Sequence, residues 1–72
     1  MKKLPRLSGK EVIKVLCKKD FKIIRQKGSH IILKNNKKKV VVVPNHKELD
    51  RGTLIEIIRQ SGIKREEFLK LI

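Results

Sequence analysis

The sequence predicts an α+β domain in which a three-stranded antiparallel sheet packs on helices, in the order α-β-β-β-α-α. Two observations predict this class. Apolar residues with helical spacing occur near both ends of the chain, and strand-like segments rich in β-branched residues lie between them, separated by turn residues. With 72 residues, the chain is expected to form a single domain, 1–72, around one thin core.

A helix is predicted from Gly9 to about Lys19. Ser8 and Glu11 have the spacing of a capping box, in which each side chain binds a backbone N–H at the start of a helix. The apolar residues that follow with helical spacing are Val12, Ile13, Val15 and Leu16. Cys17 lies beside these positions, and we expect it to pack rather than to react.

Three strands are predicted after this helix. They are expected over Phe21–Lys27, His30–Lys34 and Lys39–Val43. Gly28-Ser29 fits a two-residue hairpin whose first residue needs a positive φ, and Asn35-Asn36 tolerate the left-handed geometry of a second turn. Pro44 lacks the N–H that a sheet ladder needs, so it should end the third strand.

Two helices should complete the domain. Asp50 can cap the first of them, and Gly62 is a natural place for it to stop. A last short helix is expected over Lys64–Leu71. The helices would cover one face of the sheet, which leaves the other face open to water or to a ligand.

The charge is large and uneven. The net charge is +13, and residues 1–47 hold 15 basic and 2 acidic side chains. Such a field concentrates polyanions, so nucleic acid is the first expected partner class and an acidic protein the second. A membrane partner is not expected, because no basic amphipathic helix with Trp or Tyr anchors is present. The lone Cys17 and the lack of a hydrophobic stretch after residues 1–6 predict no disulfide and no signal peptide, which suits the cytoplasm.

The chemistry that these side chains permit is narrow. No cluster of carboxylates or cysteines and no glycine-rich phosphate loop is present, so we expect neither a metal site nor a cofactor. His30 and His46 are the two side chains that titrate near neutrality. RNA can be cleaved without a metal, because its 2′-hydroxyl is the nucleophile and the protein only moves protons and stabilises charge on phosphorus.

His30 has the better surroundings for that role. If Gly28-Ser29 is the turn, Lys27 lies opposite His30 and Arg25 lies opposite Ile32. These side chains would share the open face of the sheet, although strict alternation would also put Phe21 and Ile23 there. A bulge, a register shift or a cover from elsewhere would resolve that conflict. His46 would lie roughly 10–16 Å along the chain from the point opposite His30, so we expect a structural role for it, with catalysis as a secondary possibility.

Several segments also resemble a known family. Arg25-Gln26-Lys27-Gly28-Ser29-His30 resembles the Gly-Ser-His signature of the HicA-type (YcfA-like) toxins. Further segments that resemble this family, in the same order and spacing, are Leu7–Glu11, Val43–His46, Gly52–Leu54, Ile57–Ile63 and Glu66–Phe68. One departure is Lys64, which stands where related chains often carry a small helix-capping residue.

The resemblance implies a double-stranded-RNA-binding-domain-like fold and an mRNA-cleaving toxin of a type II toxin–antitoxin pair. It implies that His30 is the catalytic histidine, that Gly28 and Ser29 form its turn, and that a HicB-like antitoxin with an acidic surface is the partner. Cations beside His30 would bind phosphate or stabilise the transition state, and others would hold RNA further out. The first group is Lys22, Arg25 and Lys27, and the second is Lys34, Lys37, Lys38 and Lys39.

Two other functions fit the sequence less well. A non-catalytic module for double-stranded RNA would need a basic cluster at the start of the helix after the third strand, but residues 48–53 hold two acids and one Arg. An interaction subunit would use the basic face only for an acidic protein and would not bind RNA.

Overall fold

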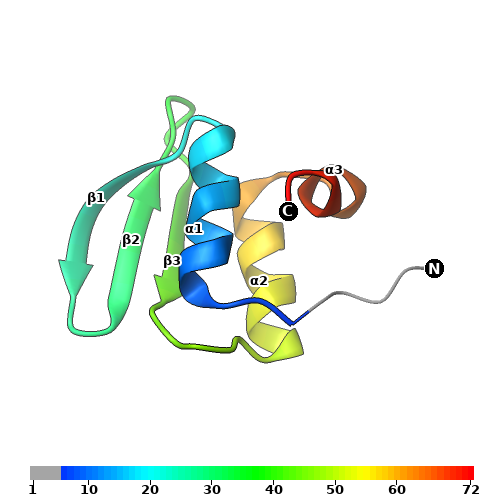
Figure 1. Ribbon diagram of the computed structural model, residues 1–72. Coiled ribbons are helices and arrows are strands. Elements are labelled where there is room, and N and C mark those ends of the chain that lie inside the picture. The colour runs from blue at the N-terminus through cyan, green and yellow to red at the C-terminus, as the bar shows by residue number, and fades with distance from the viewer. Residues whose placement is uncertain (1–5) are drawn as a thin grey trace.

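The structure is a computed structural model that describes residues 6–72 (Figure 1). Its elements are α1 (Gly9–Lys18), β1 (Lys22–Lys27), β2 (His30–Lys34), β3 (Val40–Pro44), α2 (Arg51–Ser61) and α3 (Arg65–Lys70). The strands form one antiparallel sheet in the order β1-β2-β3, and the helices lie on one side of it. The predicted α+β class and the predicted order of elements are confirmed.

The start of α1 is built as the sequence predicts. Ser8 Oγ accepts a hydrogen bond from Glu11 N at 3.1 Å, and Ser8 N donates to Glu11 Oε1 at 3.0 Å, which completes the capping box. The apolar side of α1 is buried in the core and packs on β3. Cys17 is exposed, so the expectation that it packs in the core was wrong: it lies on the outer side of the helix.

The core lies between the sheet and the helices. Side chains alternate along β2 and β3, so that Ile31, Leu33, Val41 and Val43 face the helices and are buried. Both α1 and α2 pack on β3. All six residues of β1 are exposed, because this edge strand extends beyond the helices.

The turn between β2 and β3 differs from the expectation in one detail. Asn35 Oδ1 accepts hydrogen bonds from the backbone N–H groups of Lys37 and Lys39 at 3.0 and 2.8 Å, which closes the turn. The left-handed residue is Lys38, with φ +64°, and neither asparagine has a positive φ. The asparagine therefore serves through its side chain.

The C-terminal helices close the core. Asp50 Oδ1 accepts a hydrogen bond from Thr53 N at 2.7 Å and caps α2, which ends at Gly62 with φ +74°. Lys64 is the N-cap of α3 and makes no side-chain capping bond, while Phe68 is fully buried. The departure noted at Lys64 thus leaves α3 without a side-chain cap.

Two expectations concern membranes and export. No helix within residues 6–72 is long and apolar enough to cross a membrane. The expectation of no signal peptide concerns chiefly residues 1–5, which lie outside the part of the chain that the structure describes.

Candidate functional site

A tight hairpin places His30 at the end of the sheet. Gly28 adopts φ +61°, the left-handed geometry that a side chain would oppose, and Lys27 pairs with His30 across the turn. Gln26 Nε2 donates a hydrogen bond to Gly28 O at 3.2 Å. His30 is the first residue of β2 and is exposed. The predicted turn and the predicted pairing are confirmed.

The side of the sheet away from the helices carries nine side chains in three cross-strand rows, and we call this surface the open face. The rows, each written from β1 to β3, are Lys27–His30–Pro44, Arg25–Ile32–Val42 and Lys22–Lys34–Val40. Facing partners share one side of a sheet, so each row forms a line of neighbours. The β1 column is entirely cationic and the β3 column entirely apolar, with His30 at one end of the middle column.

A bulge in β1 makes this arrangement possible. The register passes from Ile23 opposite Leu33 to Arg25 opposite Ile32, so Ile24 is an extra residue. Ile23 therefore lies on the side of buried Leu33, while Arg25 and Lys22 both reach the open face. Of the three resolutions that the sequence left open, the structure contains the bulge.

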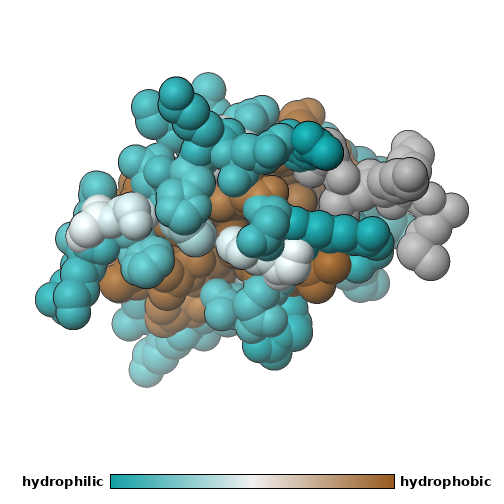
Figure 2. Space-filling model, turned by 90° about the horizontal axis from the view of Figure 1, so that it is seen from below, coloured by the Kyte–Doolittle hydropathy of each residue, from teal (hydrophilic) through white to brown (hydrophobic). Residues whose placement is uncertain are grey.

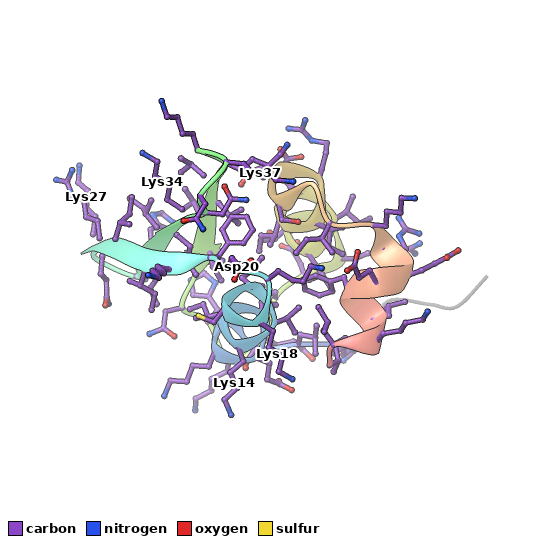
Figure 3. All side chains as sticks on the ribbon, turned by 90° about the horizontal axis from the view of Figure 1, so that it is seen from above. Lys14, Lys18, Asp20, Lys27, Lys34 and Lys37 are labelled. Atoms are coloured by element: carbon purple, nitrogen blue, oxygen red, sulfur yellow. The ribbon has the colours of Figure 1, made fainter. Side chains whose placement is uncertain are left out.

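The electrostatics of the open face are one-sided. No Asp or Glu belongs to β1, β2 or β3. Lys22 lies directly opposite Lys34, and like charges in such a pair repel each other. Figure 3 shows Lys27 and Lys34 projecting away from α1. The face therefore carries a positive charge that its own strands do not neutralise.

The connection after β3 supports the hairpin from the side. Pro44 pairs with His30, and Asn45 N donates to Ser29 O at 2.6 Å. His46 O accepts from Gly9 N at 2.9 Å, which joins this connection to the first residue of α1. Seen from below, hydrophilic side chains cover most of this end of the molecule around a hydrophobic centre (Figure 2).

His46 lies closer than expected to the point of β3 that faces His30, when the distance is counted along the chain. Because Pro44, not an earlier residue, is opposite His30, His46 follows only two residues later. Its side chain is exposed. Hydrogen bonds from Thr53 lower the pKa of the nearby Asp50, and a smaller electrostatic effect from His46 acts in the same direction. The backbone of His46 accepts the hydrogen bond from Gly9, and a structural role for this residue stays a prediction.

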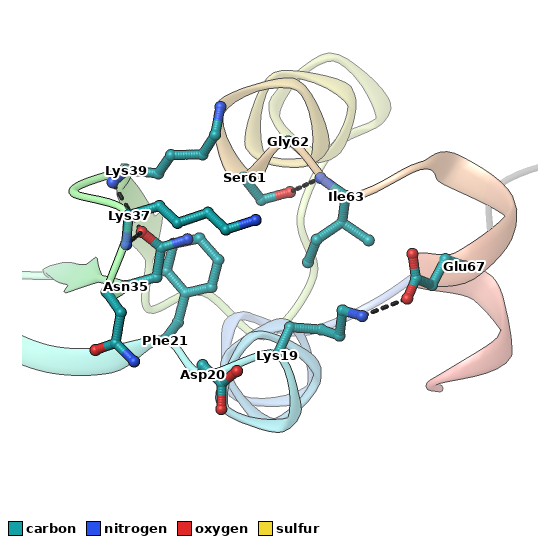
Figure 4. A pocket seen from close by; sticks show the side chains of 11 residues that line it. Lys19, Asp20, Phe21, Asn35, Lys37, Lys39, Ser61, Gly62, Ile63 and Glu67 are labelled. Atoms are coloured by element: carbon teal, nitrogen blue, oxygen red, sulfur yellow. Dashed lines mark hydrogen bonds and ion pairs between the residues drawn. The ribbon is translucent and has the colours of Figure 1, made fainter.

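The lysines of the second turn lie at the opposite end of β2 from His30. Lys37 and Lys39 line an open pocket of about 400 Å³, together with residues at the ends of α1 and α2 (Figure 4). Lys39 lies against Gly62 at the C-terminal end of α2, so its positive charge interacts favourably with the negative end of the helix dipole. Lys19 forms an ion pair with Glu67 there, and its hydrogen bond lowers the pKa of that carboxyl. The pocket lining is thus largely balanced in charge.

The structure brings together most, but not all, of the predicted site residues. Those that share the open face are Lys22, Arg25, Lys27, His30 and Lys34, with Gly28 and Ser29 in the adjoining turn. Lys37, Lys38 and Lys39 form a separate group at the far end of the sheet. Among residues 6–72, no group of three or more His, Cys, Asp or Glu side chains could hold a metal ion.

Sequence reasoning missed the apolar third of the open face. Val40 and Val42 are 47% and 39% exposed, and Pro44 completes their column. The alternation of side chains in β3 was the signal that could have shown this, because burial of Val41 and Val43 requires Val40, Val42 and Pro44 to face the other way.

Comparison with known proteins places the chain in a family. Residues 9–63 match the family of HicA toxins of bacterial toxin–antitoxin systems. No match was found among curated proteins. The matched span begins at α1 and continues past the end of α2, so it contains the whole sheet, the His30 hairpin and the connection that supports it. The chain belongs to the HicA toxin family.

Proposed function

We propose that this toxin is a metal-independent endoribonuclease that cleaves mRNA and arrests growth, with His30 as the catalytic residue. The observation that carries the proposal is the exposed His30 at the end of a cationic open face, in a chain that belongs to the HicA toxin family. Messenger RNA in the cytoplasm is the substrate.

The reaction uses the nucleophile that RNA itself supplies. The 2′-oxygen attacks phosphorus, its bond to phosphorus forms, and the bond from phosphorus to the 5′-oxygen breaks. One proton leaves the 2′-hydroxyl and one reaches the 5′-oxygen. His30 carries out one of these transfers, and water, which reaches the exposed imidazole, serves the other. The products end in a 2′,3′-cyclic phosphate and a 5′-hydroxyl.

The cations of the open face bind the substrate and stabilise the transition state. Lys27 lies opposite His30 and Arg25 lies in the next row, so their charges flank the reacting phosphate. Lys22 and Lys34 bind the chain further along β2, and the lysines of the 35–39 turn extend this path. A polyanion relieves the repulsion between Lys22 and Lys34.

The partner of the open face is a HicB-like antitoxin with an acidic surface. Charge complementarity suits a chain of net charge +13. The exposed apolar column of Val40, Val42 and Pro44 adds contact area of the kind that protein interfaces use. Binding there covers His30 and neutralises the toxin.

The decisive experiment measures cleavage of a labelled single-stranded RNA, and of DNA of the same sequence, in excess EDTA. We expect cleavage of RNA only. His30→Ala should reduce the rate at least about 100-fold, because it removes the proton-transfer group. His46→Ala is the matched control and should retain most of the rate, since the bonds around this residue use its backbone.

Near-normal cleavage by His30→Ala would overturn the assignment of the catalytic residue. RNA that is bound but remains intact after long incubation with the native chain would favour a non-catalytic RNA-binding module. In cells, growth arrest that depends on His30 would support the toxin, whereas binding to an acidic protein without RNA affinity would support an interaction subunit.

A further inference from the structure

The outer side of α1 carries a row of lysines that the proposed reaction does not use. Lys10, Lys14 and Lys18 are exposed and follow each other at intervals of four residues, so they lie along one side of the helix. Successive members are separated by a rise of about 6 Å along the axis. Figure 3 shows Lys14 and Lys18 projecting from α1 on the side of the molecule opposite Lys34.

The protein itself does little to neutralise this row. Like charges at i and i+4 repel each other, and Lys10 lies in the first turn of α1, at the positive end of the helix dipole. Within residues 6–72, neither Lys10 nor Lys14 has a carboxylate partner, and the carboxylate of Glu11 accepts from Ser8 N in the capping box. Lys18 Nζ donates to Leu71 O at 3.1 Å.

Two other cations at helices of the fold are paired with carboxylates. Lys19, at the end of α1, forms an ion pair with Glu67, and Arg59 in α2 forms one with Glu56. Within the described residues, Lys10 and Lys14 lack such an ion pair, as does Arg51 in the first turn of α2. Lys10 and Lys14 differ from Arg51 because they belong to a row of lysines along one side of a helix.

We infer that this row is a second contact for the phosphodiester backbone of RNA, remote from the cleavage site. The inference rests on the proposed ribonuclease function. One segment of the RNA would bind the open face, and a second segment of the same RNA would bind the lysine row on the opposite side of the domain. Two linked contacts raise the affinity for long RNA through effective concentration.

The chemistry of the row favours nucleic acid over a protein partner. Lysine is depleted in protein–protein interfaces, whose cores use apolar and aromatic residues. The open face has an apolar column of that kind, whereas the exposed residues of α1 are lysines, Glu11 and Cys17. Neutralising phosphates with lysines releases counterions, which gives a measurable dependence of affinity on salt.

The test compares Lys10→Gln/Lys14→Gln with Lys64→Gln/Lys70→Gln, which removes the same charge near α3. Both pairs are built in the His30→Ala chain so that RNA stays intact, and glutamine keeps the helix propensity of lysine. Fluorescence anisotropy gives the Kd for a long single-stranded RNA and for an RNA duplex at several salt concentrations. Circular dichroism confirms the fold of each variant.

We expect the α1 pair to reduce the slope of log K against log salt by about 1.4 for the single strand or about 1.8 for the duplex, and to weaken binding about tenfold or more at 0.15 M salt. Lys14→Gln alone should give about half of that change in slope. The α3 pair should change the slope by less than half as much as the α1 pair.

Equal changes in both pairs would overturn the inference, because they would show a diffuse effect of net charge. An unchanged slope in the α1 pair would also overturn it. Polyglutamate, an acidic polymer without phosphate, is measured in the same assay, and weaker binding of the α1 pair to polyglutamate without weaker binding to RNA would overturn the inference as well. The proposed function is tested separately: in the chain with native His30, the α1 pair should cleave a short RNA at the normal rate. Failure of the native chain to cleave would refute the ribonuclease and leave the binding result intact.

Discussion

The substitution Gly9→Ala, which adds one carbon atom, tests how closely the start of α1 packs against the end of β3 beside the site. A Cβ at this first residue of α1 would lie 2.3 Å from Pro44 O, 3.2 Å from Asn45 Cα and 3.3 Å from His46 N. All three are backbone atoms, so no flexible side chain can move aside. In Gly9→Ala the contact with Pro44 O must open from 2.3 Å to at least 3.0 Å.

The magnitude follows from two opposing effects. A Gly→Ala change at a compatible helical position stabilises a protein by about 0.4–1 kcal/mol, through the entropy of the unfolded chain. Overpacking a tight contact destabilises it by about 1–3 kcal/mol. The added Cβ also stretches the hydrogen bond from Gly9 N to His46 O, now 2.9 Å. Subtracting the first effect from the second gives a net loss of up to about 2.6 kcal/mol for Gly9→Ala, from a total of about 4–11 kcal/mol for a chain of this size.

Gly52→Ala is the matched control in the first turn of α2. Its Cβ would lie 3.6 Å from Asp50 Oδ1, an ordinary contact, so we expect a gain of about 0.4–1 kcal/mol. Urea unfolding of both variants measures the difference in the free energy of unfolding, which should be about 1–3 kcal/mol because the entropic gain is common to both variants and cancels. The slope against urea should not change. Gly9→Ala should also slow RNA cleavage, because Pro44 and Asn45 support His30 and Ser29.

A Gly9→Ala protein as stable as Gly52→Ala, with both more stable than the native chain, would refute the close approach of α1 to the end of β3. A loss in both variants would show that glycine is needed at the start of either helix for another reason, and the contact argument would fail.

Acid and the second turn offer two further predictions. Hydrogen bonds from Lys19 and Arg59 lower the pKa of Glu67 and Glu56, respectively. The free energy of unfolding should therefore fall as the pH drops below about 4.3 and these carboxylates become protonated. Thermal unfolding at acid pH that shows no such fall would contradict this prediction. Lys38→Gly should raise the thermal midpoint, with a gain of up to about 1 kcal/mol, because Lys38 has φ +64°, while Lys37→Gly should lower it. The reverse order would refute the strain at Lys38.

Local sequence signals were enough to predict the helices and the first hairpin. The capping box of Ser8, the cap of Asp50 and the stop at Gly62 act within a few residues, so their spacing in the chain was enough to predict α1 and α2. The hairpin at Gly28-Ser29 and the pairing of Lys27 with His30 are local in the same sense. The exposure of Cys17 was not predictable in this way, because it depends on which side of α1 meets the sheet.

The candidate site also has features that local sequence signals predict and features that only long-range packing sets. Short-range signals were sufficient to place His30, its turn, Lys27 and Arg25, since a two-residue hairpin sets which residues face each other. Lys22 reaches the open face only through the bulge. The bulge at Ile24, the pairing of Pro44 with His30, and the bonds from Asn45 to Ser29 and from Gly9 to His46 were decided only in the tertiary structure. These features depend on how α1, β3 and the hairpin pack against one another, and such long-range contacts leave no fixed spacing in the chain.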